Sequence, residues 1–210
     1  TMPEIEEATI KVIVGTEKRS HVITDKEKKL TSYHEAGHAV VTYYCPTQDP
    51  VHQISVIPRG MAGGYTMSLP QQDRSYRVKK EMLEDIQVML GGRVAEALVL
   101  EDISTGASND IEQATKLARA LITRYGMTEE FDMVALERVE NQYLGGDTAL
   151  ACAADTASRI DARVVEIVKE AHEKAFAILK ENEEKLHALA AHLLTKETIT
   201  GEESMALLQA

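Results

Sequence analysis

The stretch His34-Glu35-Ala36-Gly37-His38 constrains the fold more than any other part of this chain. Histidines four residues apart lie one above the other on an α-helix, so their rings can converge on one metal ion. Glu35 then lies beside the ion, where its carboxylate can take a proton from water and pass it to a leaving amine. This H-E-x-x-H spacing predicts a helix with a catalytic zinc site. The alternative is a buried helix with two core histidines.

The residues around this stretch favour a helix. Thr24 followed by Glu27 forms a capping box, and Pro46 marks the end of the helical pattern. Gly37 lowers helix propensity, but it lets a neighbouring backbone come close to the metal. The apolar face repeats with a period of 3.6 residues through Leu30, Tyr33, Gly37, Val40, Val41 and Tyr44.

Composition excludes several other classes of function. The net charge of −11 and the lack of a lysine and arginine cluster argue against nucleic acid as a partner. Cys45 and Cys152 show neither a disulfide framework nor a cysteine zinc site. No apolar run reaches the roughly 18 residues of a membrane span, so we expect this segment to be soluble. It enters a helical pattern directly after Thr1, which suggests a segment of a longer polypeptide.

A small β-structure is predicted directly after this helix. Val51–Ile57 is rich in β-branched residues, and Tyr65–Leu69 is a second extended run. The glycine-rich residues 59–64 form the turn between them. The pattern fits either an ordinary hairpin or an edge strand that pairs with an extended peptide substrate beside the metal.

The remainder is predicted to be helical, so the fold class is mainly α with long C-terminal helices. Asn109 and Glu112 are expected to form another capping box, and Met133–Leu136 is strand-like. Gly91-Gly92 would let the backbone pack closely against another element. Helices are expected over residues 3–14, 74–100, 109–125, 147–180 and 183–194, with a short one after Thr200.

A catalytic zinc requires a third protein ligand, and spacing alone leaves two candidates. Glu96 lies on a predicted helix face, and Asp110 lies in the first turn of the next predicted helix. Residues 41–44 are Val-Thr-Tyr-Tyr, which excludes the all-histidine H-E-x-x-H-x-x-G-x-x-H class. His52 could donate a hydrogen bond near a reacting oxygen, although a histidine at this place in a strand is more often structural.

Several blocks in this order resemble the peptidase domain of the FtsH family of membrane-anchored, ATP-dependent zinc proteases. They are His34-Glu35-Ala36-Gly37-His38-Ala39-Val40, Asp49-Pro50-Val51-His52, Ile57-Pro58-Arg59-Gly60, Gly91-Gly92-Arg93-Val94-Ala95-Glu96 and Ser104-Thr105-Gly106-Ala107-Ser108-Asn109-Asp110-Ile111. The resemblance runs from about residue 25 to the C-terminus. It implies that Zn²⁺ is held by His34, His38 and Asp110, with Glu35 as base and Glu96 as a neighbouring carboxylate.

Residues 3–19 resemble the last helix of the family's AAA ATPase module and the linker that follows. The resemblance thus divides the chain into residues 1–24, from the ATPase lid and linker, and a zinc peptidase domain at 25–210. No G-x-x-x-x-G-K-[ST] loop is present. The resemblance also implies a homo-hexamer that degrades unfolded or membrane proteins, anchored with this domain on the cytoplasmic, matrix or stromal side. The rival interpretations are a zinc aminopeptidase and a metal-free adaptor.

Overall fold

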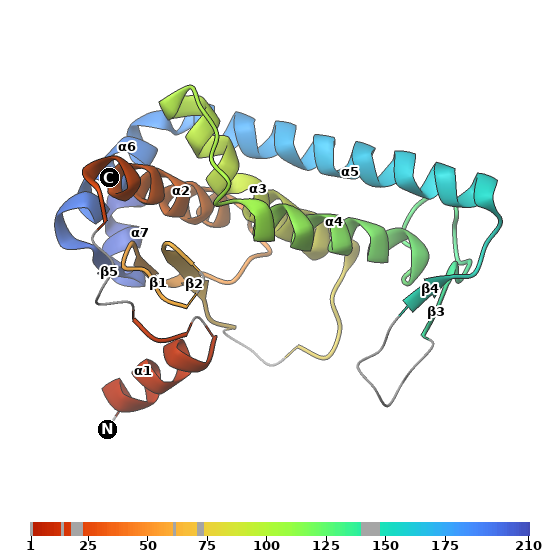
Figure 1. The fold of residues 1–210 in the computed structure, drawn as a ribbon, viewed down its shortest axis with the longest axis horizontal. Coiled ribbons are helices and arrows are strands. Elements are labelled where there is room, and N and C mark those ends of the chain that lie inside the picture. The colour runs from red at the N-terminus through yellow and green to blue at the C-terminus, as the bar shows by residue number, and fades with distance from the viewer. Residues whose placement is uncertain (1, 14, 18–22, 61, 71–73, 140–147) are drawn as a thin grey trace.

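Two helices, α2 (Asp25–Tyr44) and α3 (Lys79–Leu100), make the most extensive contact in the molecule. In Figure 1 they lie between the small sheet and the long helix α5 (Ala154–Glu181). The computed structural model describes residues 2–13, 15–17, 23–60, 62–70, 74–139 and 148–210. The other helices are α1 (Met2–Ile13), α4 (Ser108–Thr123), α6 (Glu183–Lys196) and α7 (Gly201–Gln209).

The predicted start of α2 is confirmed in atomic detail. The Glu27 amide donates to Thr24 Oγ1 at 3.2 Å, and the Thr24 amide donates to Glu27 Oε2 at 2.9 Å. Both groups of the capping box are therefore satisfied, which fixes where the helix begins. The helix ends at Tyr44, and Cys45 is already extended one residue before Pro46.

Glycine lets α2 and α3 approach until their backbones touch. A Cβ atom placed on Gly37 would lie 2.5 Å from the Gly91 carbonyl oxygen. A Cβ on Gly91 would lie 2.9 Å from the Gly37 carbonyl oxygen. Since real Cβ contacts are longer than this, any side chain here would force the helices apart. The predicted close backbone approach is confirmed on both helices.

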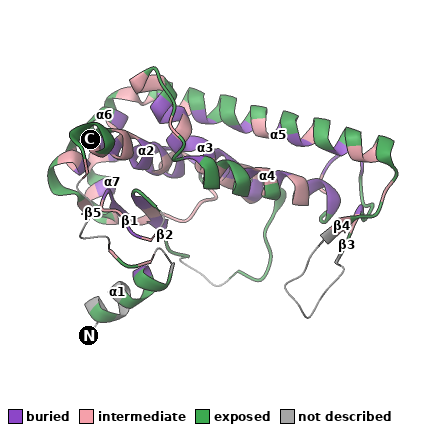
Figure 2. Cartoon of the chain, in the orientation of Figure 1, coloured by how far each residue is buried: buried purple, intermediate pink, exposed green. Residues whose placement is uncertain are grey.

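The C-terminal helices cover this pair by ordinary side-chain packing. The helix α5 packs against α3 and α4, and α6 packs against α2. Much of the side of α5 that Figure 2 shows is exposed. The buried stripe of α5, called the α5 seam below, consists of Ile160, Val164, Ile167, Ala171, Ala175 and Leu179.

The sheet beside α2 has three antiparallel strands in the order β2 (Tyr65–Ser68), β1 (Val51–Ser55), β5 (Thr198–Thr200). In β1, Ile54 is paired with Thr66 of β2 on one side and with Ile199 of β5 on the other. The predicted hairpin is therefore confirmed, and β2 is an edge strand. The sheet also contains β5, a strand from near the C-terminus that the sequence did not predict.

Several predicted boundaries are wrong. The helix expected from residue 74 begins at Lys79, and the helix expected from 147 begins at Ala154. Instead, Thr148–Leu150 is strand β4, which pairs with β3 (Glu137–Val139). The predicted strand-like Met133–Leu136 contains a turn and precedes β3. The spacing of apolar residues did not indicate this strand, because strand pairing is a long-range contact that periodicity does not detect.

The predicted capping box at Asn109 is also wrong. The helix α4 already starts at Ser108, with Ala107 at the N-cap position and no side-chain cap. The Ser108 amide instead donates to the Thr105 carbonyl oxygen at 3.2 Å.

Among the described helices, none is long and apolar enough to cross a bilayer.

Candidate metal centre

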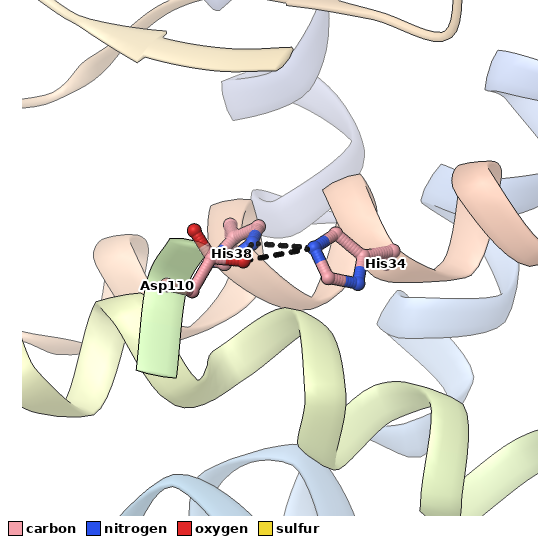
Figure 3. A group of neighbouring side chains, drawn as sticks. All are labelled: His34, His38 and Asp110. Atoms are coloured by element: carbon pink, nitrogen blue, oxygen red, sulfur yellow. Dashed lines mark hydrogen bonds and ion pairs between the residues drawn. The ribbon is translucent and has the colours of Figure 1, made fainter. Parts of the chain in front are cut away.

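Three side chains from two helices converge on one point. His34 and His38 project from the same face of α2, and Asp110 projects from the first turn of α4 (Figure 3). The two Nε2 atoms are 3.1 Å apart. Asp110 Oδ2 lies 3.3 Å from His34 Nε2 and 3.7 Å from His38 Nε2. The described residues include this one group of three or more potential ligands that could hold a metal ion.

These separations fit a tetrahedral zinc ion. Ligand atoms bound at 2.0–2.2 Å in a tetrahedron lie about 3.3–3.6 Å from one another. Two imidazole nitrogens and one carboxylate oxygen are also ligands that zinc accepts, and three protein ligands leave a fourth position open. Asp110 completes this group with a side chain that is 26% exposed, compared with 11% for His34 and 12% for His38. Asp110 thus forms the most solvent-accessible part of the group.

A backbone carbonyl sets the tautomer of His38. His38 Nδ1 lies 2.7 Å from the carbonyl oxygen of Val88, which can only accept a hydrogen bond. The proton of the neutral ring therefore resides on Nδ1, and the lone pair of Nε2 is left for a metal. Burial, and next the charge of His34, lowers the pKa of His38 to about 4. The ring is thus neutral, as a metal ligand must be.

Glu96 orients His34 in the same way. Its Oε1 atom lies 2.6 Å from His34 Nδ1, so Nδ1 donates to the carboxylate and Nε2 faces Asp110. Burial lowers the pKa of His34, but the hydrogen bonds to Asp110 and Glu96 outweigh it and raise the pKa to about 10. Without metal, His34 is therefore an imidazolium that holds two carboxylates together. A metal ion would replace its proton.

The loop before α4 is attached to α3, which fixes the position of Asp110. The Ser104 amide donates to Glu96 Oε2 at 2.8 Å, and Ser104 Oγ donates to Glu96 Oε1 at 3.1 Å. Arg93 donates to the Ser104 carbonyl oxygen at 2.5 Å. Burial raises the pKa of Asp110, but the hydrogen bond from His34 and the charges of His34 and Arg93 outweigh it and lower the pKa below its usual value. Asp110 is thus an anion.

Gly92 provides the space that the two rings occupy. A Cβ atom at this position would lie 2.6 Å from Nε2 of both His34 and His38. The α3 backbone therefore forms one wall of the metal centre. The sequence predicted a close approach at Gly91-Gly92, but it did not indicate that the approach was to the two histidines.

Glu35 is buried beside the cluster, on the side of strand β2. It is 6% exposed. Burial is the main cause that raises its pKa, to about 7, while His34 and the hydrogen bond from Thr66 lower it. Thr66 Oγ1 donates to Glu35 Oε2 at 2.7 Å. A carboxylate whose pKa is near neutral can accept a proton and release it again.

The structure thus brings together five residues that the sequence singled out: His34, Glu35, His38, Glu96 and Asp110. His52 is not in the converging group. It lies in β1, where the register with β2 shifts, and its Cα atom would be 3.2 Å from a Cβ on Gly201. Sequence reasoning missed Thr66, because nothing in an ordinary Tyr-Thr-Met strand indicates which element its hydroxyl faces.

The fold and the site define the class of the H-E-x-x-H metallopeptidases, with two histidines and a distant aspartate as potential ligands. Residues 21–207 match the sequence model of peptidase family M41, and the chain belongs to this family.

Relatives with the same region are ATP-dependent zinc metalloproteases named FtsH. The chain is 52% identical over 205 residues to the protein of that name from Caldicellulosiruptor bescii, covering 96% of this chain and 33% of the relative. It is 50% identical over 206 residues to FtsH 1 of Thermoanaerobacter sp., covering 97% of this chain and 34% of the relative. The chain therefore spans about a third of the length of these relatives.

Proposed function

We propose that this chain is the zinc-dependent endopeptidase part of an ATP-dependent protease, with His34, His38 and Asp110 as metal ligands and Glu35 as the general base. The convergence of two Nε2 atoms and Asp110 Oδ2 at 3.1–3.7 Å carries the proposal. Glu96 supports it because its contact with His34 Nδ1 is typical of the carboxylates that orient metal-binding histidines.

The reaction follows from the position of Glu35. A bound zinc ion would act as a Lewis acid, which polarises a peptide carbonyl and lowers the pKa of water toward about 7. Glu35 accepts the proton of the attacking water and transfers it to the amide nitrogen as the carbon–nitrogen bond breaks. The products are two peptides. Glu96 and the Val88 carbonyl oxygen each accept a hydrogen bond from an imidazole Nδ1, so that both Nε2 atoms face the site.

The edge strand β2 is a candidate binding element for the substrate. No other described strand pairs with the outer edge of β2, and Thr66 of this strand donates a hydrogen bond to Glu35. An extended peptide could add to such an edge through backbone hydrogen bonds, which select for unfolded chains without selecting strongly for sequence. A further part of the proposal is His52 as a hydrogen-bond donor near the reacting oxygen.

Further parts of the proposal concern the longer protein. Residues 1–24 would belong to the end of an ATPase lid and a linker, and 25–210 to the peptidase domain. The named relatives are ATP-dependent, which supports an ATPase module elsewhere in the full protein. We further propose membrane anchoring with this domain on the cytoplasmic, matrix or stromal side, a homo-hexamer, and unfolded or membrane proteins as substrates. Nucleic acid is not proposed as a partner.

The direct test measures zinc content and hydrolysis of casein. The parent chain is expected to bind one zinc per chain and to cleave. Glu35→Gln is expected to keep its zinc and lose cleavage, whereas Asp110→Ala is expected to lose both. If Asp110→Ala keeps zinc and cleaves, Asp110 is not the ligand and Glu96 is tested next. A metal-free adaptor would fold normally and never gain activity with zinc.

A second measurement separates an endopeptidase from an aminopeptidase. Peptides with a blocked N-terminus are expected to be cut at internal bonds. Activity restricted to peptides with a free N-terminus would refute the endopeptidase assignment while leaving the zinc site intact.

A further inference from the structure

One hydroxyl joins the edge strand β2 to the carboxylate of Glu35. Thr66 Oγ1 lies 2.7 Å from Glu35 Oε2 and 3.1 Å from the Glu35 carbonyl oxygen. Because a carboxylate can only accept, the hydroxyl is the donor, and 2.7 Å is the usual length of such a bond. The side chain of Glu35 is therefore attached to a strand that lies 31 residues away in sequence.

The strand holds Thr66 firmly in this place. Thr66 is paired with Ile54 of β1, and its neighbours Tyr65 and Met67 point to the opposite face, as successive strand residues do. There they form a small buried cluster with Ile10 of α1. Tyr65 also donates to Gln53 Oε1 at 2.6 Å. Since the outer face of β2 is packed, its inner face presents the Thr66 hydroxyl at a fixed position.

The two oxygens of Glu35 therefore have different surroundings. Oε2 accepts from Thr66, whereas Oε1 accepts no hydrogen bond from any residue that the structure describes. Oε1 instead faces Gly64, where a Cβ atom would lie 2.9 Å from Oε1 and 2.7 Å from the Ser55 carbonyl oxygen. Glycine at this position keeps the space around Oε1 clear.

We propose that Thr66 is a positioning residue for Glu35: its hydroxyl holds Oε2, so that Oε1 is the atom that exchanges the proton during peptide hydrolysis. The inference rests on the proposed role of Glu35 as base. Oε1 takes one proton from water as the water oxygen bonds to the peptide carbon. The same proton leaves Oε1 for the amide nitrogen as the carbon–nitrogen bond breaks. Glu35 ends ionised, and Thr66 keeps its own hydrogen throughout.

Loss of the hydroxyl would affect the rate of the chemical step and leave substrate binding unchanged. A terminal carboxylate rotates in a broad, shallow well, so Glu35 needs an external contact to fix its plane. A misplacement of about 1 Å at a reacting group can cost about 100-fold in rate. Valine has the shape of threonine and the same backbone, so a Thr66→Val strand would still pair with a peptide.

The test compares Thr66→Val with Thr66→Ser, using an internally quenched peptide with a blocked N-terminus. For Thr66→Val we expect kcat to fall by about 10- to 100-fold, from the sensitivity of proton transfer to position. KM is expected to stay within about twofold and zinc at the parent content. Thr66→Ser, which keeps the donor, is expected to restore kcat to within about threefold of the parent. The matched control is Thr195→Val, an exposed threonine of α6 that donates to Ala191.

Three results would overturn the proposal. They are parent-like kcat in Thr66→Val, loss of zinc in Thr66→Val, or a serine variant as slow as the valine variant. If Thr66→Val does not fold, the serine variant alone decides, since a slow but folded and zinc-loaded Thr66→Ser refutes the positioning role. Failure of the proposed function has a different signature: the parent is inactive, or Glu35→Gln is as active as the parent.

Discussion

The α2–α3 crossing and the α5 seam are both buried helix contacts, but they achieve close packing by opposite means. At the crossing, Gly37, Gly91 and Gly92 remove side chains so that backbones and imidazoles touch. Along the seam, aliphatic side chains fill the space. A contact made by removing atoms tolerates no additional ones, whereas a contact made by filling volume adjusts to small changes. The metal centre lies at the contact of the first kind, where an added atom cannot be accommodated without moving the helices or the imidazole rings.

The largest effect is expected for Gly92→Ala, at the crossing of α2 and α3. Its Cβ would lie 2.6 Å from Nε2 of His34 and His38, so the rings cannot keep their positions. We expect zinc affinity to fall by more than about 100-fold. The change displaces two of the proposed ligands, whereas loss of a single supporting contact already lowers affinity by about 10- to 100-fold. Metal titration with a chromogenic chelator measures it.

The matched control for Gly92→Ala is Gly63→Ala, where the new Cβ would meet, among the described residues, only Thr31 Oγ1, at 3.6 Å. Parent-like zinc affinity is expected there. Tight zinc binding by Gly92→Ala would show that α3 can move away from the rings. The crossing would then tolerate an added atom, as the α5 seam does.

Glu96→Gln should weaken the site without blocking it. Glutamine keeps the shape but removes the charge that accepts from His34 Nδ1 and Ser104. Loss of such a supporting contact lowers zinc affinity by about 10- to 100-fold. Competition with a chelator gives the value, and Glu173→Gln on the exposed side of α5 is the control. Equal affinities for both variants would contradict an orienting role for Glu96.

The metal centre should make stability depend on pH between about 7 and 9, below the range in which the buried Cys45 thiol, with its pKa raised to about 12, contributes as well. In the metal-free protein the pKa of His34 is raised to about 10, above its ordinary 6.5. The folded state therefore holds a proton that the unfolded state has lost, so the free energy of unfolding falls as pH rises from about 7 to 9. A decrease on the order of 2–3 kcal/mol is expected over these two pH units.

Urea unfolding in the presence of EDTA measures this slope. His34→Gln should abolish it, and so should saturating zinc, because a bound metal keeps the ring neutral at every pH in this range. A slope that survives His34→Gln would assign the effect to another group.

The smallest effect is expected along the α5 seam. Ile167→Val removes one buried methyl group, which costs about 0.5–1.5 kcal/mol of unfolding free energy. Zinc content and cleavage at 25 °C should equal those of the parent. Loss of zinc in this variant would mean that the seam and the metal centre are coupled, and the contrast between the two regions would fail.

Much of the helical architecture could be predicted because it depends on local spacing. The capping box at Thr24 and the short helix after Thr200 are present as predicted, and most of the helix expected over 147–180 is present as α5. Short strands such as Thr148–Leu150 were missed, since a three-residue strand is defined by its partner and has no periodicity of its own. The same limit explains why β5 was not predicted.

The sequence by itself determined that His34 and His38 share one face of a helix, because residues at i and i+4 do so whatever the rest of the chain does. It also restricted the third ligand to Glu96 or Asp110, and resemblance to a family favoured Asp110. Only the tertiary structure decided that Asp110 converges on the two Nε2 atoms while Glu96 contacts the far nitrogen of His34. Each such distance depends on how α2, α3 and α4 pack, and packing is a long-range property that no local pattern contains.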